Sequence, residues 1–317
     1  MALALKGMHH VSSLSAHIGR SRDFYTRVLG MRPAITTVNQ DDTSMYHLFF
    51  ADGAGKPGSE MTVFDLPHAA AERRGNNAIS MTTFRVNGER SLAYWDERFT
   101  ALGVPHGQIY ERDGRAVLDV DDPVGTALSL IDDDGAGDAF PWTESPVPPE
   151  HQIRGLGYVV TTVPDLEPTD RFLRDAIGAE PDHTYPVADA PRYSVHVYRI
   201  GDAEHHVIAR DDLPSARYGS GGVHHLALQV PEGQSMAEWE ERISARGYHN
   251  SGIVDRHYFT SLYVREPNHI LYELATSGPG FEVDGPIDPS RLSLPPALEP
   301  RRAEIESNLR PIDDPGA

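Results

Sequence analysis

The chain of 317 residues contains no cysteine. Disulfides, zinc–thiolate sites and thiol nucleophiles are therefore excluded, and His, Asp or Glu must hold any metal ion. The chain also lacks an unbroken apolar run of about 18 residues, so no membrane-spanning helix is predicted. Its N-terminal segment is too short and too weakly basic for a signal peptide. These absences favour a cytoplasmic protein.

Basic residues are few. The 28 Lys and Arg residues stand against 47 Asp and Glu residues, and the formal net charge is −19. No basic stripe offsets this charge, so neither nucleic acid nor an anionic membrane is expected as a partner. An apolar fraction of 39% is enough for a packed core. A length of 317 residues is enough for two ordinary domains or one large one. The pattern leaves open whether the protein forms a homo-oligomer.

The chain does contain one structural unit repeated four times, at a period of roughly 70 residues. Each copy is predicted to form a strand, a helix and then three strands. The first copy has Ser21 as its helix N-cap, and its later strands are expected at 33–39, 45–51 and 60–66. The four predicted helices cover residues 21–30, 91–102, 169–177 and 236–246, and each ends at or next to a glycine.

A βαβββ unit cannot bury both faces of its sheet alone, whereas two units side by side make a curved eight-stranded sheet with a central cleft. The predicted fold is therefore α+β, with four βαβββ modules forming two curved mixed-sheet barrels.

The strongest chemical signal is a His-His pair that occurs twice, at residues 9–10 and 224–225, each in a short apolar strand. A third apolar strand carries Glu273. Two imidazoles and one carboxylate on separate strands form the ligand set of a mononuclear non-heme Fe(II) site with open positions. Strand alternation places His10 with Ser12 on one face, and the two histidines of each pair on opposite faces.

Three further segments are Tyr-His-Leu-Phe-Phe at 46–50, Asp-Arg-His-Tyr-Phe-Thr-Ser-Leu-Tyr-Val-Arg-Glu-Pro at 255–267 and Leu-Pro-Pro-Ala-Leu-Glu-Pro-Arg-Arg at 294–302. Together with the repeat and the His-His pairs, they make the chain resemble the vicinal oxygen chelate (glyoxalase/bleomycin-resistance fold) superfamily. Within it, the chain is most similar to the ring-cleaving dioxygenases that act on hydroquinones. The resemblance covers essentially the whole length.

This resemblance implies an Fe(II) enzyme that inserts both atoms of O2 into a hydroquinone or a catechol-type diol, and Mn(II) suits the same ligands. It selects the second His of each pair, so the implied metal ligands are His10, His225 and Glu273. The first histidines, His9 and His224, are expected to orient the ligand imidazoles. The family pattern also places four residues near the metal or the substrate: Ser12, His224, Arg256 and Tyr263.

The middle two copies lack the ligands, because Ser129 and Gly157 or Tyr158 stand where ligands are expected. The metal-binding domain is therefore expected to pair the first and last copies, residues 1–70 plus 215–280. A metal-free domain is expected over 76–210. A Pro-rich tail over 281–317 is expected to wrap the fold or to form an oligomer contact.

Two alternatives remain open. A glyoxalase-type isomerase needs a second carboxylate ligand from the strand 60–66, where Phe64 is the best match to Glu273 and Asp65 faces the other way. A non-catalytic binding protein of the same fold needs no metal ligands.

Other roles are open as well. Arg256 could instead pair with Asp255, and Tyr263 could simply pack in the sheet. The cleft could also be lined by His47, His249 and His257. Eight further histidines are interpreted as surface or turn residues: His17, His68, His106, His151, His183, His205, His206 and His269.

Overall fold

The computed structural model describes residues 3–312, which form two mixed sheets of eight strands each. One sheet contains β1 (Gly7–Ser15), β2 (Arg32–Val38), β3 (Tyr46–Ala51), β4 (Glu60–Asp65), β13 (Val223–Val230), β14 (Asn250–Asp255), β15 (Phe259–Arg265) and β16 (Leu271–Pro279). The other contains β5 (Ala78–Val86), β6 (Tyr110–Arg112), β7 (Arg115–Asp121), β8 (Ala127–Asp132), β9 (Leu156–Val163), β10 (Glu180–Pro186), β11 (Ser194–Ile200) and β12 (Ala203–Ala209). The predicted fold class is confirmed.

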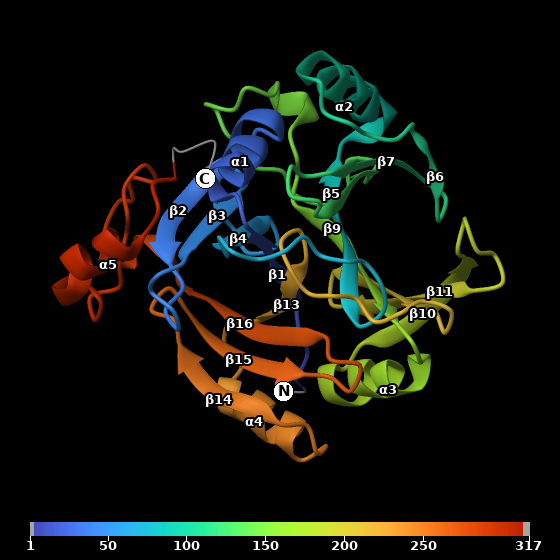
Figure 1. Cartoon of the computed structure of the whole chain (residues 1–317). Coiled ribbons are helices and arrows are strands. Elements are labelled where there is room, and N and C mark those ends of the chain that lie inside the picture. The colour runs from blue at the N-terminus through green and yellow to red at the C-terminus, as the bar shows by residue number, and fades with distance from the viewer. Residues whose placement is uncertain (1–2, 313–317) are drawn as a thin grey trace.

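The strand order shows how the four modules combine. The first sheet runs β14-β15-β16-β13-β1-β4-β3-β2, and the second runs β10-β11-β12-β9-β5-β8-β7-β6. Each sheet is joined at its centre by two antiparallel strands, β1 with β13 and β5 with β9. The first and last modules thus share one sheet although they lie at opposite ends of the chain (Figure 1).

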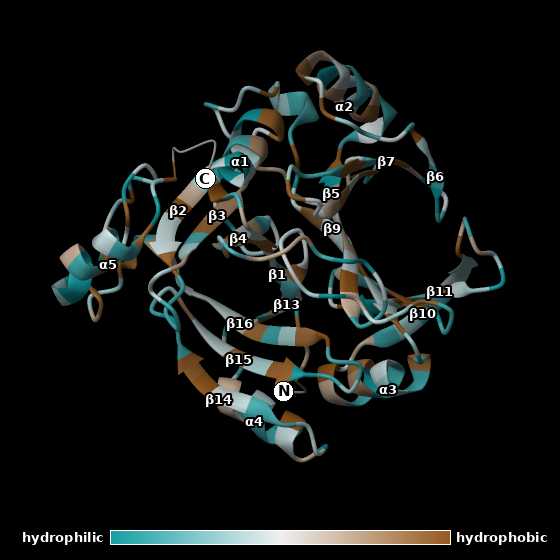
Figure 2. Ribbon diagram, in the orientation of Figure 1, coloured by the Kyte–Doolittle hydropathy of each residue, from teal (hydrophilic) through white to brown (hydrophobic). Residues whose placement is uncertain are grey.

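Four main helical segments lie around the outside of the two sheets (Figure 1). They are α1 (Ile18–Asp23) with the π-helical turn η1 (Phe24–Val28), α2 (Gly88–Leu102), α3 (Leu166–Arg171) with the π-helical turn η3 (Phe172–Ile177), and α4 (Met236–Ser244). Their large side chains Tyr25, Trp95, Phe172 and Trp239 are fully buried. Each such side chain stabilises the fold by about 2 kcal/mol or more through the hydrophobic effect. Figure 2 shows apolar segments in the strands and in the helices.

Three helices begin earlier than predicted. Ser21, the expected N-cap, lies inside α1 and donates a hydrogen bond to the Ser15 hydroxyl over 2.8 Å. In α3 the cap is Asp165, whose carboxylate accepts from the Glu167 amide. Thr169 instead lies buried and donates to the Glu266 carboxylate over 2.8 Å. These hydroxyls resemble caps in the sequence, but they satisfy partners from elsewhere in the fold.

The Pro-rich tail packs against one edge of the first sheet, the edge formed by strand β2. Three short segments follow β16: η4 (Phe281–Asp284), η5 (Glu299–Arg301) and α5 (Arg302–Asn308), and another short turn, η2 (Pro149–His151), precedes β9. Leu294 and Ile305 pack on Val38 of the edge strand β2. The expected tail extends to 317, and its residues 313–317, like residues 1–2 of the first module, lie outside the described residues. Over residues 3–312, no helix is long and apolar enough to cross a membrane.

The expectation that His205 and His206 lie at the surface or in a turn is wrong. Both lie on β12 and are almost completely buried, His205 on the face toward the first sheet and His206 on the opposite face, where it stacks on Tyr158. The Nε2 atom of His205 lies 3.1 Å from the Tyr272 hydroxyl on β16. Burial lowers the pKa of His205 from 6.5 to about 3, and the adjacent His206 adds to this effect.

The lowered pKa of His205 predicts that acid weakens the fold. Between about pH 6.5 and pH 3 the unfolded chain binds a proton at this side chain and the folded chain does not. The free energy of unfolding is therefore expected to fall as the pH drops through this window, by up to about 1.4 kcal/mol per pH unit. In urea unfolding at pH 7 and pH 5, His205→Gln should lose less stability than the wild type. An equal loss would contradict the assignment.

Candidate metal centre

Three adjacent strands bring the predicted ligands together. β1 and β13 run antiparallel with Ser12 opposite His225 and His10 opposite Ala227. β13 and β16 run parallel with Ala227 opposite Glu273. His10, His225 and Glu273 are each at most 2% exposed.

The three ligand atoms form a compact triangle. The Nε2 atoms of His10 and His225 lie 3.0 Å apart, and Glu273 Oε2 lies 3.3 Å from the first and 2.9 Å from the second. An octahedral ion with bonds of about 2.1 Å places neighbouring ligands about 3 Å apart. Glu273 Oε2 is buried and has no hydrogen-bond partner among the described residues. The arrangement therefore fits a divalent cation held on one face.

The charges of this triangle match the same role. Burial acts against the charged form of Glu273, but the imidazoles of His10 and His225 outweigh it and hold its pKa well below 4.5. Burial lowers the pKa of His225, against the opposing effect of Glu273. A neutral imidazole and an ionised carboxylate are the forms that bind metal ions.

Both His-His pairs share one hydrogen-bond pattern. His10 Nδ1 lies 3.0 Å from Nδ1 of His9, and His225 Nδ1 lies 2.7 Å from Nδ1 of His224. Nε2 of His9 lies 3.2 Å from the Thr276 carbonyl and must donate to it. His9 Nδ1 is then a lone pair that accepts the proton of His10 Nδ1, which leaves His10 Nε2 free for a metal ion.

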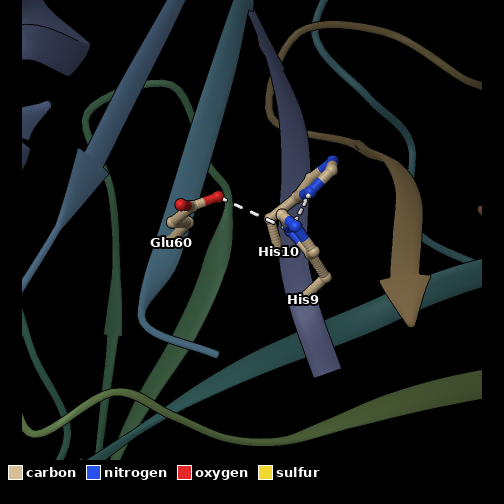
Figure 3. Close-up of side chains that lie close together, drawn as sticks. All are labelled: His9, His10 and Glu60. Carbon is tan, nitrogen blue, oxygen red and sulfur yellow. Dashed lines mark hydrogen bonds and ion pairs between the residues drawn. The ribbon is translucent and has the colours of Figure 1, made fainter. Parts of the chain in front are cut away.

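Sequence analysis missed a buried acid behind this centre. Glu60 lies on β4 opposite His10, and its Oε2 atom is 3.6 Å from Nδ1 of His9 (Figure 3). This oxygen has no hydrogen-bond partner within residues 3–312, and burial raises the pKa of Glu60 well above 4.5. His9, His10 and Glu60 form a second group of close ligand atoms. The sequence held one signal for this residue, a Glu at the first position of the mostly apolar strand β4.

The triangle forms one wall of a cavity of about 270 Å³. Of the other predicted residues, His224, Arg256 and Tyr263 line it. Ser12 lies behind the wall, with its hydroxyl 3.0 Å from His225 Nε2, and His9 is not among the lining residues. The apolar part of the wall includes Leu14, Val38, Met45, Phe49, Phe64, Tyr258, Phe259 and Leu271.

Arg256 pairs with a residue far away in the sequence. Its guanidinium donates to both carboxylate oxygens of Asp41, over 2.9 and 2.7 Å, rather than to Asp255. Its Nε atom lies 3.3 Å from the Tyr263 hydroxyl. Asp41 belongs to the β2–β3 loop, so this ion pair closes one side of the cavity. Among the open histidines, His47 lines the cavity, whereas His257 lies outside it and contacts Asp284.

The strand register places Thr62, rather than Phe64, at the position that corresponds to Glu273. On β4, Thr62 lies opposite Ser12, which is two residues after His10. On β16, Glu273 lies opposite Ala227, which is two residues after His225. Asp65 is bound to Arg310 over 2.7 Å. β4 therefore offers no second carboxylate to the three-atom cluster.

The second sheet has a different group at the corresponding place. Met81 and Tyr158 stand where His10 and His225 stand in the first sheet, because both central strand pairs share one register. The Arg112 guanidinium lies between them, 3.1 Å from Met81 Sδ, 3.3 Å from Ser129 Oγ and 3.4 Å from the Tyr158 hydroxyl. A side-chain cation thus fills this cleft.

Comparisons with known proteins agree with this geometry. The family model "Glyoxalase/Bleomycin resistance protein/Dioxygenase superfamily" matches residues 155–274. A Bacillus subtilis (strain 168) protein named as a ring-cleaving dioxygenase, MhqA, is 44% identical over 98% of this chain and all of its own length. The chlorohydroquinone/hydroquinone 1,2-dioxygenase of Sphingobium indicum is 28% identical over 98% of this chain and 97% of its own.

A solved structure is also similar throughout. The crystal structure of a Bacillus subtilis protein described as a dioxygenase has a TM-score of 0.88 and 30% identity, and the match covers 98% of both chains. The resemblance inferred from the motifs is confirmed. The chain belongs to the glyoxalase/bleomycin resistance protein/dioxygenase superfamily, and within it to the ring-cleaving dioxygenases.

Proposed function

We propose that the protein is an Fe(II)-dependent dioxygenase of the extradiol type, which opens the ring of a hydroquinone or a catechol-type diol with both atoms of O2. The observation that carries this proposal is the triangle of His10, His225 and Glu273 on one wall of a cavity. Two imidazoles and one carboxylate suit Fe(II), and Mn(II) fits the same set. A bound Fe(II) supplies open positions and a path for electrons from the ring to O2.

The side chains around the cavity assist the substrate. His224 accepts the Nδ1 proton of His225, so its own Nε2 carries a proton, and that atom makes no hydrogen bond within residues 3–312. We assign His224 as the group that donates a hydrogen bond to a substrate oxygen. Burial lowers its pKa to about 3, with His225 adding to the effect, so the imidazole is neutral.

Arg256 and Tyr263 supply electrostatic support. The guanidinium of Arg256 places a fixed positive charge at the cavity wall, where it stabilises an anionic oxygen of the substrate. Burial raises the pKa of Tyr263, so its hydroxyl keeps its proton and can donate it in a hydrogen bond. Ser12 and His9 act as positioning residues, since they contact the ligand imidazoles rather than the cavity.

Two features of the site speak against the alternatives. An isomerase of the glyoxalase type needs a fourth protein ligand, but Thr62 occupies that position and Asp65 is paired with Arg310. A passive binding protein has no use for a buried carboxylate oxygen that lacks a partner, as in Glu273.

Oxygen uptake tests the proposal. The protein is loaded with Fe(II) without air and then given hydroquinone, 2-methylhydroquinone, chlorohydroquinone or catechol in an oxygen electrode. We expect one O2 consumed per diol opened, and labelled O2 should place both atoms in the product. The absence of uptake with all four diols, or turnover with Zn(II) and no O2, contradicts the proposal.

A further inference from the structure

We infer that His47 reads the substrate hydroxyl that does not bind the metal. This inference rests on the proposed function, because it assumes a diol with one oxygen at the three-ligand centre. His47 lies on β3 and lines the same cavity as His10, His225 and Glu273. Its Nδ1 atom has no hydrogen-bond partner within residues 3–312 and is not among the buried atoms without one. This nitrogen is therefore open to the cavity.

The ring of His47 is held in place by two aromatic neighbours. It stacks on Phe64 with ring centroids 3.8 Å apart and planes 21° apart, and it lies 4.1 Å from the Phe49 ring. Both phenylalanines also line the cavity. A ring held in this way presents Nδ1 in one direction. A fixed direction is what a site needs to discriminate between a ligand with a hydroxyl at this position and a ligand without one.

A chain of hydrogen bonds sets the tautomer of His47. Its Nε2 atom lies 2.8 Å from the Thr62 hydroxyl, which lies 2.6 Å from the Ser12 hydroxyl, which lies 3.0 Å from His225 Nε2. A metal ion bound by His225 takes the lone pair of its Nε2 atom, so this atom cannot accept from Ser12. Ser12 then donates to Thr62, and Thr62 donates to His47 Nε2. Every proton in the chain points away from the ligand triangle.

The direction of this chain fixes what His47 offers to a ligand. Its Nε2 atom accepts from Thr62, so the single ring proton sits on Nδ1, which is a donor and calls for an acceptor on the substrate. Burial holds the pKa of His47 well below 6.5. The substrate class is therefore a diol whose second hydroxyl oxygen accepts a hydrogen bond from His47.

Anaerobic calorimetry tests this inference. Titration of the Fe(II)-loaded protein with hydroquinone and with 4-fluorophenol compares two ligands of similar size, of which only the first has a second hydroxyl. We expect hydroquinone to bind about tenfold more tightly, the contribution of one neutral hydrogen bond. His47→Phe keeps a ring between Phe49 and Phe64 but removes the donor, so the affinity ratio should fall to about one.

Two further variants separate the hydrogen bond from packing. Thr62→Val breaks the chain and frees the tautomer, so the affinity ratio should fall while the His47 ring stays. Phe64→Leu weakens the stack, so both affinities should fall together and the ratio should persist. A ratio near one in the wild type, or an unchanged ratio in His47→Phe, overturns the inference. In that case oxygen uptake with hydroquinone still shows whether the proposed function holds.

Discussion

Replacing Glu273 with Gln is expected to remove the bound metal and to lower ring cleavage by more than about 100-fold, the upper end of what losing a supporting residue costs. The amide has no negative charge to offset a divalent cation, and its carbonyl is a much weaker ligand. The loss should be sharp, because Oε2 is the only carboxylate atom in the triangle with His10 and His225.

Glu60→Gln is a matched control for this experiment. Glu60 is also a buried carboxyl group with an unpartnered oxygen near His10, but it groups with His9 and His10 and lies outside the triangle, so the amide removes no predicted ligand. This variant should keep its metal.

Metal content by mass spectrometry and thermal unfolding with and without Fe(II) measure the difference. Metal at about 1,000 times its Kd should stabilise the wild type by about 4 kcal/mol and leave Glu273→Gln unchanged. Stoichiometric metal in Glu273→Gln would contradict the assignment of Glu273 as a metal ligand.

Replacing Arg112 with Met is expected to lower the free energy of unfolding by about 2 kcal/mol while metal content stays the same. Arg112 is 13% exposed and binds the Asp119 carboxylate over 2.7 Å. Its removal leaves that carboxylate without its cation and the Tyr158 hydroxyl without a donor. The usual cost of 3–5 kcal/mol for breaking a buried pair is reduced here, because Asp119 is a third exposed and water screens it.

Urea unfolding of Arg112→Met beside Arg27→Met checks this result. Arg27 pairs with Asp23 on the surface, where its side chain is 77% exposed, so its replacement should cost less than about 1 kcal/mol. Equal losses in the two variants would show that the guanidinium in the second sheet contributes no more than a surface charge.

The ligand triangle could be predicted because each member is visible in a short pattern. His10 and His225 repeat within matching apolar strands, and Glu273 is the lone acid in another. The repeat then indicates which strands to compare, and the motif blocks add the family. All of this information is local or periodic, so it can be obtained from the sequence without knowing the register in which the strands pair.

The features that sequence analysis missed depend on register and on contacts between distant residues. Thr62 faces the site only because β4 pairs with β1 in one register, and Asp41 reaches Arg256 across 215 positions. His205 and His206 look like polar residues of a short strand, but the first sheet covers His205 and Tyr158 of the second sheet covers His206. Nothing within a few residues of these positions encodes such neighbours.

The placement of β1 beside β13 also has a consequence for the order in which the protein is made. β1 begins at Gly7 and β13 at Val223, so one edge of β1 waits while the intervening residues are synthesised. At roughly 5–20 residues per second, that wait lasts on the order of ten seconds or more. The second sheet lies entirely between residues 78 and 209 and can close first. The sheet that carries His10, His225 and Glu273 is therefore expected to close after the second sheet, and the waiting edge of β1 is exposed to faulty pairing in the nascent chain.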